Sequence, residues 1–189
     1  MKENETLKIN PLPSKTWYWL HLNDTTVKWN GNVQPCMVTT EEPEQVSEAG
    51  LNIKEMTTGA GAEADTLFSD ENLPVLQLTA KAEDGERIIR LDISGEDKEN
   101  AAGTVYITTE ENAHVTVIEK FISGKKAQSD LAFRTKLYAK KNSRIRLIQI
   151  NMLDEGQRLL NAVGSVCDET AKLDVLQMLI GRGDVYNGI

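Results

Sequence analysis

Two cysteines and two histidines are the side chains of this sequence best suited to bind a metal or to act as nucleophiles. Cys167 ends a strand-like run and precedes the acidic pair Asp168–Glu169, so a solvent-reachable thiolate there could serve sulfur or metal chemistry. The alternative is that Cys167 is a small buried hydrophobic side chain. Cys36 follows Pro35 in a predicted loop, and its distance in sequence from Cys167 fits neither a CxxC metal site nor a disulfide framework. Cys167 is therefore the one candidate metal ligand, and no cofactor-binding residue is assigned.

The other candidates for catalysis lack the companions that their chemistry requires. His114 takes the outward phase of a predicted strand and His21 follows an apolar pair, and neither has an identified acid or base beside it. The glycines of 59–62 are not followed by the Lys-Ser/Thr of a phosphate-binding loop, and no GxSxG sequence occurs. Paired acids at 84–86 and 95–97 are typical of solubilising turns, because a general-acid pair needs a facing groove. We predict no catalytic residues and a protein that is not an enzyme.

The composition indicates one acidic globular domain. The 189 residues carry a net charge of −8, and 40% of them are hydrophobic, which suits neither a disordered chain nor a nucleic-acid-binding protein. No apolar run approaches the roughly 18–20 residues that cross a membrane. The acidic start at Met1–Glu5 lacks the basic and apolar regions of a secretory signal. We expect a cytoplasmic protein with no nucleic-acid and no membrane partner.

Basic residues gather in one stretch between Lys120 and Arg146, which contains a single acid, Asp130. One interpretation is a face that binds anions or an acidic partner. The alternative is the solvated side of a sheet whose alternate residues point inward. The basic residues are Lys120, Lys125, Lys126, Arg134, Lys136, Lys140, Lys141, Arg144 and Arg146.

The C-terminal half contains three copies of one pattern, each a strand-like run, a polar turn and a second strand. The second strands start at Val115, Ile145 and Leu173, which gives a repeat of about 28–30 residues. Strands that repeat at this spacing predict the stacked coils of a parallel β-helix, because one coil cannot bury its own apolar face. An antiparallel β-sandwich is the alternative, since several short strands with glycine turns also fit it.

Alternating apolar and polar residues indicate which side chains face inward. Val115 and Val117 share one phase, and the other two copies alternate in the same way. The apolar phase then shifts by one residue, to Ile118, Ile148 and Leu176. We interpret this shift as a bulge or a corner in each strand.

The domain organisation follows from these patterns. Residues 1–70 have no clear period and are expected to form a small mixed α/β cap on the first coil, while residues 71–189 form the coils. Short helices are predicted at Glu41–Val46 and at Asp65–Phe68. Residues 181–189 enter a new strand-like run and stop without a polar capping unit. We therefore expect a truncated solenoid, or an end that closes against a second copy.

Two segments of the coils resemble the core of the SufB/SufD family, the scaffold components of the SUF system of iron–sulfur cluster assembly. They are LPVLQLTAKAEDGERIIRLDISG from Leu73 and TVYITTEENAHVTVIEKFISG from Thr104. The stretch LPSKTWYWL from Leu12 is similar to the N-terminal region of family members. The most specific part of the resemblance is ENAHVTVIE at 111–119.

The resemblance implies a right-handed parallel β-helix that serves as a non-catalytic scaffold subunit. It also implies a cytoplasmic complex with an ABC-type ATPase and a second β-helix subunit, with an iron–sulfur cluster as transient cargo and no intrinsic cofactor. Cys167 resembles a cysteine that precedes an acidic turn in SufB-type coils, and no residue can be carried over for ATPase docking. The alternative function is a β-helix that binds or degrades polysaccharide, because a basic outer face could bind acidic sugars.

Overall fold

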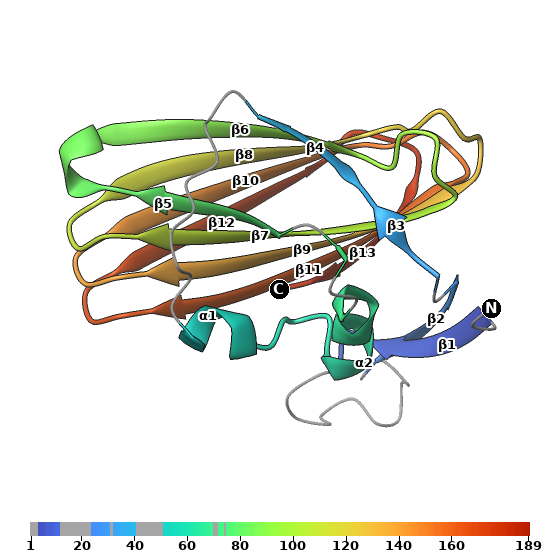
Figure 1. Cartoon of the computed structure of the whole chain (residues 1–189), viewed down its shortest axis with the longest axis horizontal. Helices are drawn as coiled ribbons and strands as arrows, with labels where there is room; N and C mark the ends of the chain where they lie inside the picture. Colours follow the sequence, from blue (N-terminus) through green and yellow to red (C-terminus); the bar gives the residue numbers. More distant parts are fainter. Residues whose placement is uncertain (1–3, 12–23, 31, 41–50, 70–71, 74) are drawn as a thin grey trace.

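Most of the chain is β-structure wound into stacked coils (Figure 1). The computed structural model describes residues 4–11, 24–30, 32–40, 51–69, 72–73 and 75–189. Strands contain 60% of the residues and helices 8%. The parallel coils form a β-solenoid of about four turns, which confirms the predicted parallel β-helix. The antiparallel sandwich is wrong, because strands of successive coils pair in parallel.

Two long sheets form the walls of the solenoid, and each coil supplies one strand to each wall. In sheet 1 the spatial order is β12 (Lys172–Leu179), β10 (Arg144–Met152), β8 (His114–Ile122), β6 (Glu86–Ser94) and β4 (Met37–Thr40). In sheet 2 it is β13 (Asp184–Gly188), β11 (Gln157–Cys167), β9 (Ser129–Ala139), β7 (Asn100–Thr109) and β3 (Gln34–Pro35). Strand β5 (Val75–Ala80) also pairs with β7. The inner faces of the two sheets enclose the core.

The register of sheet 1 confirms the predicted repeat. Ile145 lies opposite Val115 on one side and Leu173 on the other. Strands β5 and β6 pair in parallel with β7 and β8, as expected of an earlier coil. A fixed register places equivalent repeat positions side by side on the same face of the sheet.

Each of the last three coils turns through a residue in the left-handed backbone region. Asn112, Asn142 and Thr170 occupy the equivalent position, with φ of 63°, 57° and 64°. The backbone N–H of Asn112 donates to the carbonyl of Lys141, and that of Asn142 donates to the carbonyl of Glu169. Asparagine tolerates this region better than a β-branched residue does, so Thr170 is the strained member of the stack.

We expect Thr170→Asn to raise the free energy of unfolding by about 1 kcal/mol, because it removes a β-branched side chain from the left-handed region. The new amide can keep the hydrogen bond that Thr170 donates to Asn142 Oδ1. Urea titration measures the change in the free energy of unfolding. Asn142→Thr is the converse variant, and its free energy of unfolding should fall by a similar amount. An unchanged midpoint in Thr170→Asn would argue against strain at this turn.

The shift of apolar phase in the second strands is not a bulge. Alternation continues along β8 and β10, so Ile118 and Ile148 are the more exposed side chains while Glu119 and Gln149 are buried. Leu176 is 53% exposed. The predicted bulge is therefore wrong: the strands continue straight, and polar side chains take the inward positions.

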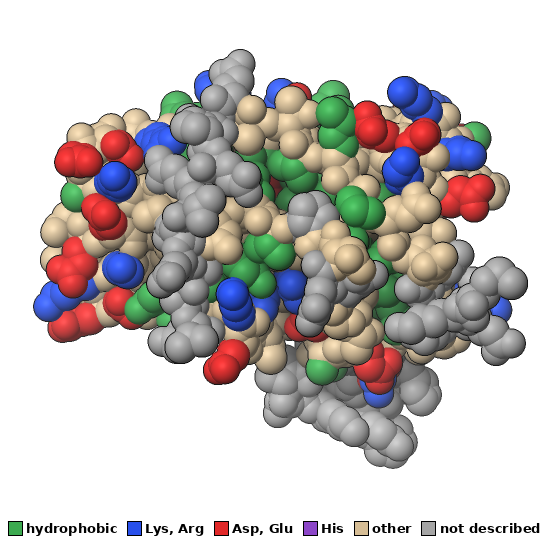
Figure 2. Space-filling model, viewed as in Figure 1, with side chains coloured by type: hydrophobic (Ala, Val, Ile, Leu, Met, Phe, Trp, Pro, Cys, Tyr) green, Lys and Arg blue, Asp and Glu red, His purple; other side chains and the backbone are tan. Residues whose placement is uncertain are grey.

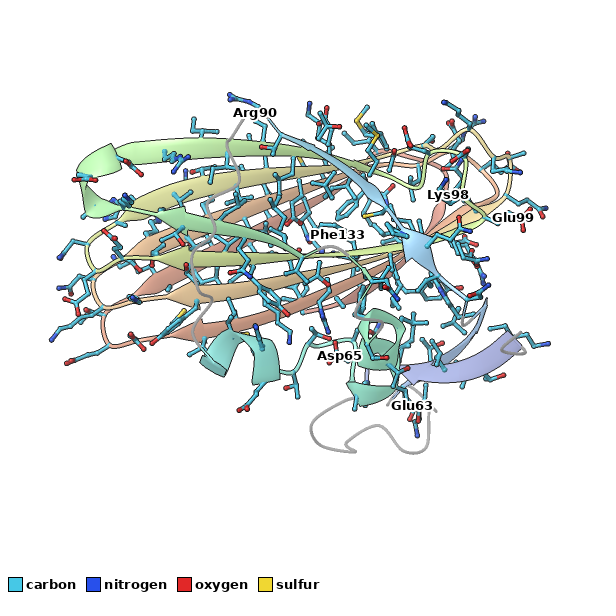
Figure 3. The ribbon with its side chains drawn as sticks, in the orientation of Figure 1. Glu63, Asp65, Arg90, Lys98, Glu99 and Phe133 are labelled. Atoms are coloured by element: carbon cyan, nitrogen blue, oxygen red, sulfur yellow. The ribbon has the colours of Figure 1, made fainter. Side chains whose placement is uncertain are left out.

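The apolar part of the interior packs closely around Phe133 (Figure 3) and Phe121. Their rings meet edge to face with centroids 5.7 Å apart. Cys36, between β3 and β4, is buried against Gly103 of β7. A Cβ at position 103 would lie 2.3 Å from Cys36 Sγ. Burial raises the pKa of Cys36 to about 12. Cys36 thus remains a thiol near neutral pH and packs as an apolar side chain.

Gly103→Ala is expected to lower the free energy of unfolding by about 1–3 kcal/mol, because its methyl group has no room beside Cys36. Gly95→Ala is the control, since a Cβ there would meet Ala101 Cβ at an ordinary 3.6 Å. Denaturant titration compares the two variants. The double variant Cys36→Ala/Gly103→Ala should lose less free energy of unfolding than the two single variants lose together. Equal losses of stability in Gly103→Ala and Gly95→Ala would contradict the close approach of Gly103 to Cys36.

The N-terminal elements pack mainly against the outer side of sheet 2. They are the hairpin β1 (Asn4–Ile9) and β2 (Thr25–Asn30), helices α1 (Leu51–Glu55) and α2 (Ala62–Asp65), and the 3₁₀ turn Thr66–Phe68. A second apolar cluster joins Trp29, Leu67 and Phe68 to the outward side chains Ala102 and Ala132. The helices therefore cover the side of the solenoid, whereas β4 lies along the edge of β6.

The structure describes only part of the region for which short helices are predicted. The helical segment expected at Asp65–Phe68 is confirmed by α2 and the 3₁₀ turn that follows it. The helix predicted at Glu41–Val46 and the side chain of His21 lie outside the described residues.

Candidate functional site

A column of polar side chains runs through the interior of the solenoid. In sheet 1, Gln149 lies in register between Glu119 and Gln177, and in sheet 2 Asn161 lies opposite Asn187. Because every coil repeats the same register, one inward polar position in each coil builds a continuous line. We call this set the polar column; its members are Glu119, Thr135, Gln149, Asn161, Gln177 and Asn187.

Hydrogen bonds connect the column from Glu119 to the last coil. Gln149 Nε2 donates to Glu119 Oε2 at 2.8 Å, and Thr135 Oγ1 donates to Glu119 Oε1 at 2.9 Å. Gln149 Oε1 accepts from Asn161 Nδ2 at 2.7 Å and from Gln177 Nε2 at 2.8 Å. Asn161 Nδ2 also donates to Asn187 Oδ1 at 3.0 Å. Gln149 thus bonds to both neighbouring coils in its own sheet and to the opposite sheet.

Glu119 is fully buried, and burial raises the pKa of its carboxyl group to about 7, although the bonds from Gln149 and Thr135 pull in the opposite direction. A carboxyl group with this pKa exchanges its proton near neutral pH. The column therefore contains one group that can hold or release a proton, surrounded by amides that can donate or accept hydrogen bonds.

The column reaches the surface at the last coil. Gln177 and Asn187 are partly exposed there, and they line a hollow of about 10 Å³ together with Asn151. Asn151 Nδ2 is buried and has no hydrogen-bond partner among the described residues. A volume of this size holds about one water molecule. Within the described part of the chain, the polar column therefore ends beside this hollow.

Residues 92–189, from the end of β6 to the last residue, match the family model described as SUF system FeS cluster assembly, SufBD core domain. The chain belongs to this family. No curated protein and no solved structure matches the chain. Every member of the polar column lies within the part that matches the SufBD core.

Cys167 lies in the SufBD core at the end of β11, where its side chain is exposed. Partial burial and the charge of Asp168 raise the pKa of its thiol, which disfavours the thiolate. Asp168 in turn accepts a hydrogen bond of 3.1 Å from the hydroxyl of Tyr138. Among the described residues, no three His, Cys, Asp or Glu side chains come together as a metal site. Cys167 is therefore in no such group of described residues, and its role stays a prediction.

The polar column is the feature of the SufBD core that the sequence analysis missed. A signal for it exists, because Glu119, Gln149 and Gln177 each follow the apolar residue at the shifted phase of their repeat. Polar residues at one repeat position point to a shared interior role once the coils are aligned. His114, by contrast, lies in register with Arg144 on the exposed side of sheet 1, as predicted.

The basic stretch of the SufBD core does not form one face, because it runs through strands of both sheets. On sheet 1, Lys120 lies 3.4 Å from Asp92, and Arg144 Nε donates to Asp174 at 2.8 Å. On sheet 2, Arg134 is turned toward the N-terminal helices, 4.7 Å from the ring of Phe68. The interpretation as a solvated side of a sheet therefore fits Lys120 and Arg144, whereas Arg134 packs against the N-terminal segment.

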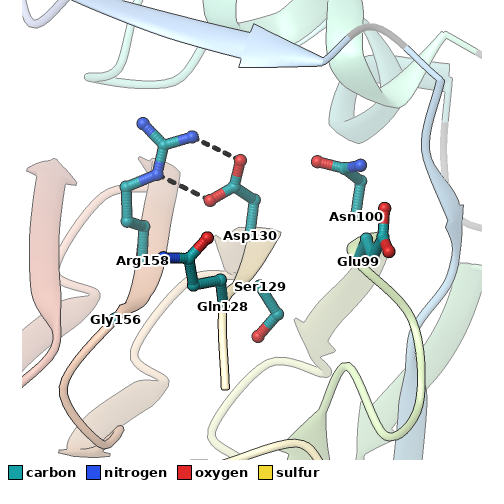
Figure 4. Close-up of a pocket in the computed structure, with 7 residues that line it drawn as sticks. All are labelled: Glu99, Asn100, Gln128, Ser129, Asp130, Gly156 and Arg158. Atoms are coloured by element: carbon teal, nitrogen blue, oxygen red, sulfur yellow. Dashed lines mark hydrogen bonds and ion pairs between the residues drawn. The ribbon is translucent and has the colours of Figure 1, made fainter. Parts of the chain in front are cut away.

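A polar depression of about 460 Å³ lies where the strands of sheet 2 begin (Figure 4). Arg158 Nε donates to Asp130 Oδ1 at 2.6 Å, and this pairing raises the pKa of Arg158. The indole ring of Trp29 lies 5.4 Å from the Arg158 guanidinium. Glu99 adds a second carboxylate to the lining. Lys126 Nζ lies 3.9 Å from Glu99 Oε1, so both carboxylates of the lining are paired with cations.

Proposed function

We propose that the chain is a non-catalytic scaffold subunit of SUF iron–sulfur cluster assembly, acting in the cytoplasm. The match of residues 92–189 to the SufBD core carries this proposal. An iron–sulfur cluster is then the transient cargo of the assembled complex and not a resident cofactor. Among the described residues, no helix has the length and apolar character needed to span a membrane.

The proposed partners are the ABC-type ATPase of the SUF system and a second β-helix subunit. Within the described part of the chain, β12 and β13 are the last strands of their sheets. Leu176, Leu179 and Ile180 lie at this end with 53%, 63% and 62% of their surface exposed. Unpaired strand edges flanked by apolar side chains pair readily with another strand. We assign this open end to the second β-helix subunit, and without that subunit a second copy of the chain can occupy it.

Co-expression with the tagged SUF ATPase and β-helix partner tests the proposal, by anaerobic co-purification and its stoichiometry. We expect a stable complex from the wild-type chain. Leu179→Glu/Ile180→Glu should reduce recovery of the β-helix partner by about tenfold or more, because it places charges in an apolar contact. Ile88→Glu is the matched control, since Ile88 is 46% exposed on β6, away from the open end.

Folded proteins that form no complex would contradict the assembly role. Titration with uronate oligomers then tests the polysaccharide alternative directly, and saturable binding would support it. Light scattering of the chain alone tests the homodimer, which Leu179→Glu/Ile180→Glu should disrupt while Ile88→Glu does not.

A further inference from the structure

Two cationic side chains are buried between sheet 2 and the N-terminal helices. Arg134 and Lys136 project from the outer side of β9, where the register places them beside Thr104 and Tyr106 of β7. Only 11% of the Arg134 side chain is exposed, and Lys136 is 2% exposed. In Figure 2, the Lys and Arg side chains that reach the surface of this face are seen near its middle, beside apolar side chains. Arg134 and Lys136 themselves are mostly covered, so they are packed side chains and not part of a solvated surface.

Within the described part of the chain, the Tyr106 hydroxyl interacts with Arg134, but other donors of the cluster lack an acceptor. Arg134 Nη1 is 4.0 Å from Asp65 Oδ1, beyond a hydrogen bond, and Arg134 Nε is buried with no partner among the described residues. Lys136 Nζ donates to the carbonyl of Lys54 at 2.6 Å and lies 5.8 Å from the ring centroid of Tyr106. An ammonium group has three donors, so one carbonyl does not satisfy it.

Among the described residues, one carboxylate forms an ion pair with one of the two cations of the cluster. Asp65, on α2 (Figure 3), is this carboxylate, and it already accepts from the N–H and hydroxyl of Thr58. Burial lowers the pKa of both Arg134 and Lys136, and the charge of Arg134 lowers that of Lys136 further. A buried cation without a full counter-charge is costly, and a bound anion would remove that cost.

We propose that Arg134 and Lys136 form a binding site for a small oxyanion such as inorganic phosphate. The guanidinium offers a planar pair of donors that matches two oxygens of an oxyanion, and the ammonium adds a point charge. On the neighbouring strand β7, Thr104 lies in register with Arg134 and Tyr106 with Lys136. The site joins the N-terminal helices to the SufBD core, and it is independent of the assembly role.

Isothermal titration with inorganic phosphate at constant ionic strength tests this site in the full chain. We expect saturable binding at one site, weakened about tenfold or more in Arg134→Gln and in Lys136→Gln, because each variant removes a charge-assisted hydrogen bond. Lys140→Gln is the matched control, since Lys140 is an exposed cation in the turn after β9, and its affinity should equal that of the wild type.

Absence of saturable phosphate binding, or equal affinity in all the variants, overturns the proposal. Crystals of the unmodified chain soaked in tungstate give a second test that no folding defect can affect. Anomalous density beside the Arg134 guanidinium supports the site, and density only at other positions refutes it.

Discussion

Replacing Glu119 with glutamine is expected to raise the free energy of unfolding at pH 8 by about 3 kcal/mol. Burial raises the pKa of Glu119 from 4.5 to about 7 in the folded chain. Between these values the unfolded chain loses the proton while the folded chain keeps it, so stability falls as the pH rises. Each pKa unit between the folded and the unfolded chain changes the free energy of unfolding by about 1.4 kcal/mol. The wild-type chain has therefore lost the full amount once the pH is above 7. Glutamine removes this penalty because it stays neutral.

Urea titration of the wild type and of Glu119→Gln between pH 4 and pH 8 measures this effect. The difference in stability should be small near pH 4 and grow to its full size above pH 7. Glu111→Gln is the matched control, since Glu111 is exposed in the turn before β8, and it should keep the wild-type dependence on pH. Parallel stability curves for wild type and Glu119→Gln would show that Glu119 is ionised in the folded chain.

The coils were predictable from the sequence because their signal is local and repeated. Val115, Ile145 and Leu173 mark the same position in three repeats, and parallel stacking places them in register. Composition alone could not assign the interior, because Ile118 and Ile148 are as apolar as the residues that do face inward. What decides their orientation is the uninterrupted alternation of the strand, which carries Glu119 and Gln149 inside.

Polar residues could not be placed inside from one coil taken alone. A single buried glutamine is costly, but Gln149 finds partners on two neighbouring coils and on the opposite sheet. The burial of Arg134 and Lys136 was hidden for a related reason. It depends on helices that precede β9 by more than sixty residues in the sequence. The sequence of β9 itself does not indicate that these helices will cover its outer side.

Gln149→Leu is expected to lower the free energy of unfolding by about 3 kcal/mol. Its amide donates to Glu119 and to Asn161 Oδ1, and both acceptors lose that donor in the variant. A buried polar atom left without its partner costs about 1–3 kcal/mol, and at least two are affected here. The added apolar surface of leucine cannot offset this loss, because it faces the remaining amides of the polar column.

Ile148→Gln is the comparison that separates the two interpretations of this strand. If Ile148 faced inward at a bulge, Ile148→Gln would be the damaging change and Gln149→Leu the mild one. With Ile148 on the outer side of β10, the order reverses, and Ile148→Gln should cost less than about 1 kcal/mol. Gln128→Leu, at an exposed glutamine, controls for the substitution itself. Denaturant titration of the three variants thus determines the phase of the strand, and with it whether the solenoid has a polar interior.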